Sequence, residues 1–248
     1  MSLQNNLFDQ ISTNYLKYRA PKKLVLKRIH QLLEKHQKAD GKLLDLGCGV
    51  GNYLDALDNH CGFNRYGLDS SIAMLTANSV IRNRAFLVQG DFCKVLPFRT
   101  ESFQVVFAID VLHFVNSIPS LLSEIRRILL PGGVFIAVLH TPEDIRIQTL
   151  SQYFPETTKL ELPQAKKLLR LKSCALNKEF VLLSKYQDIE RIKASKAFLK
   201  LFEHKCASAL HEISPAEYLK GVRKLRLDFT RKKLIGAESH TTYVFRRT

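Results

Sequence analysis

Three glycines at alternate positions follow an acidic residue in the stretch LLDLGCGVGNY, residues 43–53: Asp45 precedes Gly47, Gly49 and Gly51. Glycine adopts positive φ angles without a steric penalty, and its missing side chain lets the backbone approach a ligand closely. Such a turn also directs the free N–H groups and the positive dipole end of the next helix toward that ligand. The stretch therefore predicts a strand, a turn and a helix that bind a nucleotide-like cofactor, although a glycine-rich turn without a ligand would have the same composition.

The glycine spacing distinguishes between two classes of cofactor. A dinucleotide fingerprint reads G-x-G-x-x-G, whereas this stretch reads G-x-G-x-G with Asn52 in the sixth position, which disfavours a nicotinamide oxidoreductase. The stretch resembles motif I of the class I S-adenosylmethionine-dependent methyltransferases, commonly D/E-x-G-x-G-x-G. The resemblance implies that the three glycines let the backbone approach the methionine part of the cofactor. It implies cofactor binding by the whole turn: Asp45, Gly47, Cys48, Gly49 and Gly51.

A second acidic residue ends the next predicted strand, residues 65–69, and lies 18 positions past the last glycine. In doubly wound folds an acid at this place hydrogen-bonds the ribose hydroxyls of a nucleotide. Asp69 suits that role, and the hydroxyl oxygens of Ser70 and Ser71 can cap the helix that follows. The sequence GLDSSIAML is similar to motif II of the same family, so Asp69 and Ser70 join the expected cofactor site.

The third predicted strand, residues 86–89, is followed by a Gly-Asp pair. In the family the matching pair lies beside the adenine, which implies that Asp91 accepts from the exocyclic amine and that Phe92 packs on the ring. The fourth strand is an almost continuous apolar run, which is typical of a central parallel strand buried on both faces. The resemblance implies that Ala108 and Ile109 of this strand also line the cofactor.

Candidate proton-transfer groups follow the fourth and fifth strands. Asp110 and His113 come directly after the fourth strand, where ligands of such sheets bind. His113 is a candidate general base because imidazole titrates near neutral pH; the alternative is a histidine that only packs at the start of a helix. His140, at the end of the fifth strand, is a second candidate base.

Two tyrosines and an arginine lie near the N-terminus. In many small-molecule methyltransferases a Y-x-x-x-R-type segment folds over the cofactor, and Arg19 would suit its carboxylate. Tyr15 and Tyr18 would belong to the same segment. Packing tyrosines and a helix cap are the alternative for these residues.

The periodicity of apolar residues supplies the remaining elements. The segment RILLPGGVF is similar to the family's L-K-P-G-G signature, and the final TTYVF alternates as a strand that is antiparallel by resemblance. The layout of the tail is most similar to the type 11 group of methyltransferases, which acts on varied small molecules. We therefore expect an α/β fold: a doubly wound, Rossmann-like, seven-stranded sheet with a helical insertion between strands five and six. Later strands are expected at 105–109, 134–139, 179–186 and 241–245, and helices at 22–36, 53–57, from 72, 118–130, 188–202 and 216–229.

This layout predicts a single domain of residues 1–248. Residues 1–38 form an N-terminal helical cover, and residues 39–141 form the cofactor-binding core. The helical segments 142–180 and 188–235 cover the substrate in this prediction.

The composition places limits on the cellular setting. No apolar run approaches the roughly 20 residues that a membrane helix needs, and the N-terminus has no signal-peptide pattern. The cysteines are odd in number and scattered: Cys48, Cys61, Cys93, Cys174 and Cys206. This argues for reduced thiols in the cytoplasm, and against disulfides or a zinc site. We expect no bound metal.

Positive charge is concentrated in the last part of the chain. Residues 1–158 carry 17 basic and 14 acidic side chains, whereas residues 159–248 carry 21 basic and 9 acidic ones. Such a surface can bind a polyanion, or it can simply be a solvated basic face. The chain has neither an aromatic-rich RNA module nor an N/D-P-P-Y-type sequence.

The resemblance implies methyl transfer from S-adenosylmethionine, with S-adenosylhomocysteine as product, to an oxygen, nitrogen or carbon atom of a small-molecule partner. One alternative is an RNA methyltransferase that uses the basic last third of the chain. Another is a protein that binds the cofactor without catalysis.

Overall fold

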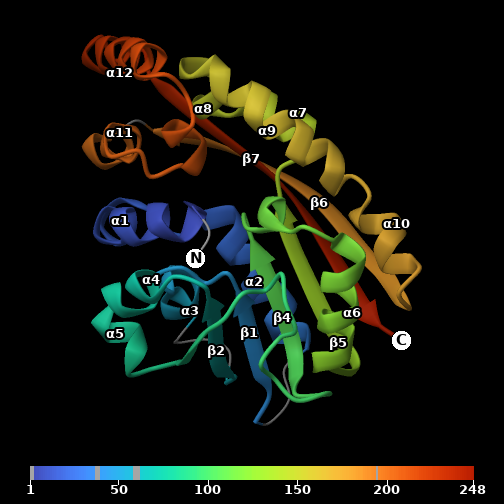
Figure 1. Cartoon of the computed structure of the whole chain (residues 1–248). Helices are drawn as coiled ribbons and strands as arrows, with labels where there is room; N and C mark the ends of the chain where they lie inside the picture. Colours follow the sequence, from blue (N-terminus) through green and yellow to red (C-terminus); the bar gives the residue numbers. More distant parts are fainter. Residues whose placement is uncertain (1–2, 37–39, 58–61, 194) are drawn as a thin grey trace.

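The computed structural model describes residues 3–36, 40–57, 62–193 and 195–248, and its centre is a seven-stranded sheet (Figure 1). The strand order is β3-β2-β1-β4-β5-β7-β6. Neighbours from β3 to β5 are parallel, and β7 is antiparallel to both β5 and β6. This confirms the doubly wound sheet and the antiparallel last strand. The bounds are β1 Lys42–Leu46, β2 Asn64–Asp69, β3 Phe86–Gln89, β4 Phe103–Ile109, β5 Leu129–Leu139, β6 Phe180–Lys193 and β7 Ile235–Arg247.

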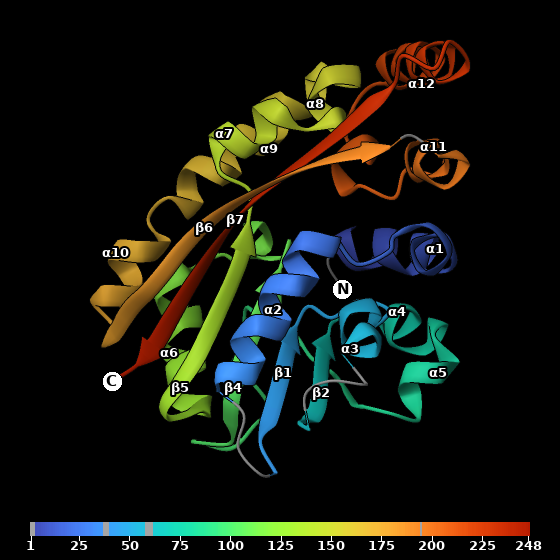
Figure 2. The same ribbon diagram turned by 180° about the vertical axis from the view of Figure 1, so that it is seen from behind.

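Helices cover both faces of the sheet (Figures 1 and 2). On one face, the buried residues of α2 follow helical spacing at positions 25, 29, 32 and 33, and they pack with α3 and α5 against the sheet. On the other face, α6 and α10 pack against the opposite side chains of the same strands. Every residue of β4 is buried, as expected for a central strand. The bounds are α2 Lys23–Lys35, α3 Asn52–Ala56, α4 Ile72–Ala77, α5 Ser79–Arg82, α6 Ile118–Ile128 and α10 Leu171–Leu176.

A second layer of helices lies beyond the carboxyl ends of the central strands, at the top of Figure 1. Its members α8, α11, η2 and α12 share a small apolar core of their own, centred on Phe154, Phe202, Leu210 and Leu225. The N-terminal helix α1 lies between this layer and α4. The bounds are α1 Leu3–Tyr18, η1 Leu112–Phe114, α7 Pro142–Ile147, α8 Thr149–Tyr153, α9 Pro155–Leu168, α11 Lys196–Glu203, η2 Ser208–His211 and α12 Pro215–Thr230. No helix in the described ranges has the length and apolar character of a membrane span.

The expected helix at 188–202 is wrong in its first part. The strand β6 continues to Lys193, and the helix α11 begins only at Lys196. The reason is that β7 starts at Ile235, earlier than expected, and pairs with β6 along its whole length, from Phe180↔Arg247 to Lys193↔Ile235. The covering segment 188–235 is therefore a strand end followed by helices.

The helix expected at 118–130 ends at Ile128, and β5 begins at Leu129. Leu129 pairs with Phe103, and the register then shifts before Val134 pairs with Val105. The Pro-Gly-Gly segment therefore forms an irregularity inside β5, where Gly132 has a φ of 75°. The expected strand at 134–139 is the regular part of β5.

Candidate active site at the carboxyl ends of the central strands

The glycine turn after β1 needs glycine at all three positions because Gly47, Gly49 and Gly51 have φ angles of 73°, 55° and 76°. A Cβ at Gly47 would lie 2.6 Å from the Val111 side chain. At Gly49 the nearest atom to a Cβ would be Tyr15 Cε1 of α1, at 3.9 Å. The outer side of the turn therefore faces Tyr15 of α1 at an ordinary van der Waals distance.

Asp69 at the end of β2 is tied to this turn. Its Oδ2 accepts a hydrogen bond from Gly49 N at 2.8 Å, and its Oδ1 accepts one from Ser71 N at 2.9 Å. Burial raises the pKa of Asp69, although the backbone N–H donors oppose that rise. The hydroxyl of Ser71 caps α4 by accepting from Met74 N, as expected, and donates to Asp9 of α1 at 2.5 Å. The parallel pairing of β1 with β2 brings the two predicted motifs together.

The acid and the thiol of the turn point into the protein. Asp45 is 3% exposed, and burial together with Asp69 raises its pKa well above the usual value. Cys48 is also buried, and burial raises the pKa of its thiol. Both side chains therefore lie on the interior side of the turn.

The residues expected beside the adenine and along β4 differ in exposure. Asp91 is exposed and accepts from Cys93 N at 2.8 Å, while Phe92 is half-buried against the core. Ala108 is 0% exposed and Ile109 is 8% exposed, so both lie under the surface at the end of β4. Their roles beside the cofactor stay predictions.

The helix α1 covers the site. Its Phe8 ring meets Phe114 of η1 edge to face, with ring centroids 5.7 Å apart. The Arg19 guanidinium lies 3.5 Å from Asp110 Oδ2 and also lies over the ring of Tyr15. Tyr18 instead stacks on His204 at the far side of the helix, with ring centroids 4.8 Å apart. Arg19 and Tyr15 therefore border the site, whereas Tyr18 does not.

A cavity of about 260 Å³ opens between α1, the ends of β4 and β5, and the second helical layer. His113 lines it, packs against Phe114, and has a pKa lowered to about 4 by burial, so the ring is neutral at pH 7. Both apolar and polar side chains line the cavity. The polar and charged lining includes Arg19, Lys22, Asp110, His113, His140, Gln148, Thr149, Glu161, Gln164, Glu212, Glu238 and His240.

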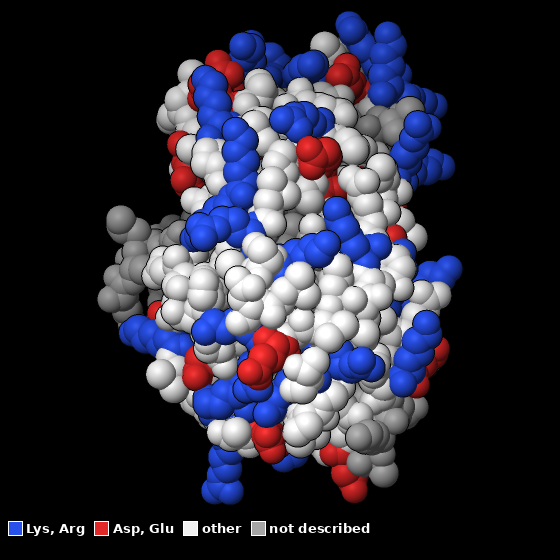
Figure 3. All heavy atoms as spheres, turned by 90° about the vertical axis from the view of Figure 1, so that its right-hand side faces the viewer, with Lys and Arg blue, Asp and Glu red and all other residues white. Residues whose placement is uncertain are grey.

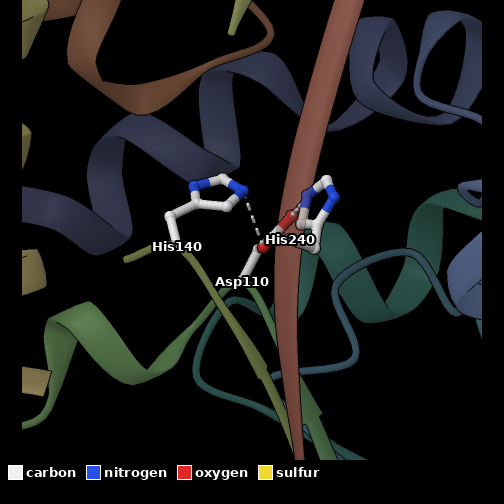
Figure 4. Close-up of side chains that lie close together, drawn as sticks. All are labelled: Asp110, His140 and His240. Atoms are coloured by element: carbon white, nitrogen blue, oxygen red, sulfur yellow. Dashed lines mark ion pairs between the residues drawn. The ribbon is translucent and has the colours of Figure 1, made fainter. Parts of the chain in front are cut away.

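Asp110, His140 and His240 form a cluster in the wall of this cavity (Figure 4). Asp110 and His140 follow the ends of β4 and β5, and His240 lies inside the neighbouring strand β7. Asp110 has a φ of 56°, an uncommon conformation that often marks a functional position. Lys22 Nζ contacts both Asp110 Oδ2 and His240 Nε2. Burial alone would raise the pKa of Asp110, but Lys22 and the two histidines hold it well below its usual range.

Sequence reasoning missed three of the cavity residues. Glu161 of α9 has a buried Oε2 without a hydrogen-bond partner among the described residues, and burial raises its pKa to about 7. Lys22 begins the helix expected at 22–36, and the sequence pattern assigns no role to His240. Nothing in their local spacing marks them, since they meet Asp110 from 88 and 130 positions away.

Comparison with known proteins gives a match for the central part of the chain. Residues 44–137 match the family model described as "Methyltransferase domain". Sterol 24-C-methyltransferase ERG6B of Gibberella zeae is 35% identical over 100 residues, which are 38% of this chain and 26% of that protein. The uncharacterized protein MJ0638 of Methanocaldococcus jannaschii is 35% identical over 120 residues, 47% of this chain and 48% of that protein. Sterol methyltransferases are thus covered over only about a quarter to a third of their length.

Solved structures share the fold over most of the chain. A putative methyltransferase from an antibiotic biosynthesis pathway of Anabaena variabilis has a TM-score of 0.69 at 17% identity and covers 94% of this chain and 100% of that chain. Phosphoethanolamine N-methyltransferase 2 of Haemonchus contortus, in complex with S-adenosyl-L-methionine, has a TM-score of 0.53 at 20% identity, covering 89% of this chain and 52% of that chain. At such identities the likeness concerns the fold.

Proposed function

We propose that the protein transfers a methyl group from S-adenosylmethionine to a small-molecule acceptor, because residues 44–137 match the methyltransferase domain model. One observation carries the proposal: the left-handed glycine turn and the Asp69 carboxylate meet at one edge of the sheet. The cavity beside them has room for an acceptor. The sterol methyltransferases among the relatives support a small molecule as that acceptor.

The residues around the turn suit such a cofactor. The Asp69 carboxylate accepts backbone N–H groups, among them those of Gly49 and Ser71, and its remaining lone pairs can accept from ribose hydroxyls. Because Gly49 has no side chain, the methionine part can approach its backbone closely. In this proposal Asp91 and Phe92 flank the adenine, and Arg19 lies near the carboxylate of the methionine part.

The chemistry asks little of the protein beyond positioning. Bound there, S-adenosylmethionine supplies a methyl group on a sulfonium sulfur, which is already electrophilic. The cavity walls hold the acceptor so that its nucleophile is in line with the S–CH3 bond. His113 is neutral at pH 7 and lines the cavity, so it can take a proton from an O–H or N–H nucleophile.

The elements divide the work in this proposal. The helices α1 and α2 form the N-terminal cover, and residues 39–141 form the cofactor-binding core. The helices within 142–180 and 196–235 close over the acceptor. The described cysteines Cys48, Cys93, Cys174 and Cys206 are free thiols, which fits a cytoplasmic location.

RNA is the second candidate acceptor because of the basic residues 159–248. In Figure 3, Lys and Arg side chains spread over a whole face of the molecule, with Asp and Glu among them. A spread of this kind favours a solvated basic surface over a defined RNA track, so we place RNA second.

Methyl transfer from radiolabelled S-adenosylmethionine into fractionated cell extract tests the proposal. Label in the small-molecule fraction supports it and supplies a compound to identify. Label in RNA, with a transfer that weakens steeply as salt rises, would replace the small-molecule acceptor by RNA. Cofactor binding without label in any fraction would favour a non-catalytic binding protein.

A further inference from the structure

Three metal-ligating side chains converge on one point of the cavity wall (Figure 4). Asp110 follows β4, His140 follows β5, and His240 lies in β7. The pairing of Leu139 with Thr241 in the β5–β7 ladder places the two histidines opposite each other, with ring centroids 4.6 Å apart. One ligand atom of each residue lies within 4.8 Å of the others. The sheet itself therefore fixes the cluster.

The contact between Asp110 and His140 has the spacing of two ligands but lacks a hydrogen bond. Asp110 Oδ1 and His140 Nε2 are 3.3 Å apart, yet neither buried atom has a hydrogen-bond partner among the described residues. Two donor atoms on one ion, each about 2.0–2.2 Å from it, lie roughly 3.0–3.5 Å apart. Buried polar atoms without partners cost free energy. An ion between these atoms would satisfy both.

The other side of the cluster already holds a positive charge. The Lys22 ammonium contacts Asp110 Oδ2 and His240 Nε2, which are themselves 3.6 Å apart. Lys22 Nζ also lies 3.8 Å from Glu238 Oε2, so the ammonium keeps an acidic partner if another cation displaces it. The site thus accommodates a cation, and Lys22 competes for the place.

We propose that Asp110, His140 and His240 bind one divalent transition-metal ion in competition with the Lys22 ammonium. Two imidazoles and one carboxylate suit ions such as zinc, iron(II), cobalt(II) or nickel(II), whereas calcium and magnesium prefer oxygen ligands. The three residues line the cavity, so open coordination positions can bind an oxygen or nitrogen atom of the acceptor. This last step rests on the proposed methyl transfer, but metal binding does not.

The expectation of no metal rested on the scattered cysteines. The ligands are 30 and 100 positions apart along the chain and follow no local spacing rule. Only the pairing of the strands brings them together.

The test uses the full chain, treated with a chelator and dialysed, without S-adenosylmethionine. Titration with Co²⁺, followed by visible absorption, and with Zn²⁺, followed by calorimetry, should give one ion per chain. Replacing either histidine, His140→Ala or His240→Ala, should weaken binding by more than about 100-fold, beyond the usual effect of residues that only support a ligand. The control is His113→Ala, because His113 lines the same cavity but is not part of the cluster. This variant should keep the wild-type affinity for the metal ion. Lys22→Met should bind the ion more tightly than the wild type.

Two results would overturn the site. One is the absence of saturable Co²⁺ binding in both the wild type and Lys22→Met, with circular dichroism showing both proteins folded. The other is wild-type affinity in His240→Ala. Since neither titration involves methyl transfer, failure of the metal site leaves the proposed function standing, and the reverse also holds.

Discussion

Replacing Asp69 with asparagine should weaken cofactor binding. The side chain keeps its size, but the negative charge is lost and one oxygen becomes an NH2 donor. In the structure both oxygens accept backbone N–H groups, from Gly49 and from Ser71. The amide NH2 must therefore face either one of these donors or a ribose hydroxyl.

The loss of one charge-assisted hydrogen bond sets the expected size of the effect. Such a bond contributes about 1.5–3 kcal/mol, which corresponds to a roughly 10- to 150-fold rise in the dissociation constant. Because burial raises the pKa of Asp69, wild-type affinity should also fall as the pH drops through that raised pKa, at a higher pH than for an exposed aspartate. Asp69→Asn should show a weaker pH dependence.

Calorimetric titration with S-adenosylhomocysteine measures this effect. Asp55→Asn is the matched control, because Asp55 lies on α3 next to the turn, and its side chain is 40% exposed in an ion pair with Arg84. That control should bind as tightly as the wild type within about twofold. Thermal unfolding without ligand checks that Asp69→Asn is folded. An unchanged dissociation constant in the folded Asp69→Asn protein would refute the role of Asp69.

Three further predictions concern the candidate base His113, the glycine turn at Gly47, and the carboxylate of Asp144. His113→Ala should lower kcat by about 100-fold or more. The assay runs from pH 5 to pH 9, because His113, with a pKa of about 4, is neutral from roughly one pH unit above that pKa. Wild-type turnover of the variant over this whole range would remove His113 as the base. Gly47→Ala should unfold more easily in urea than Gly132→Ala: both positions have φ near 75°, which costs about 1–2 kcal/mol, but only Gly47 lacks room for a Cβ. Burial would raise the pKa of Asp144, but hydrogen bonds donated to it lower the value, so its contribution to stability is complete above about pH 4 and is lost as the pH falls further. Urea titrations should therefore show a smaller difference in the free energy of unfolding between Asp144→Asn and the wild type at pH 3 than at pH 7.

Local spacing was enough to predict that the glycine turn and Asp69 lie close together. The turn from Asp45 to Gly51 and the acid Asp69 each follow a strand, and parallel strands end at the same edge of the sheet. The structure accordingly joins Gly49 to Asp69 by a hydrogen bond. The doubly wound, seven-stranded sheet with an antiparallel last strand followed from the same strand patterns and the resemblance.

The cavity beyond β4 and β5 depends on contacts between distant parts of the chain. Residues 188–193 have apolar side chains at Ile189 and Ile192, a spacing that fits a helix, yet they form a strand because β7 offers a pairing partner. This tertiary pairing overrides a local pattern. The pairing of β7 with its other neighbour, β5, places His240 beside Asp110, and α9 brings Glu161 into the cavity. The residues next to His240 and Glu161 in the sequence do not indicate these contacts.

A crystal structure with S-adenosylhomocysteine is the most direct test of the central claim. The account predicts the ribose hydroxyls within hydrogen-bond distance of Asp69, the adenine against Phe92, and the sulfur facing the cavity that His113 lines. A ligand bound away from the glycine turn, or a sulfur directed away from the cavity, would contradict it.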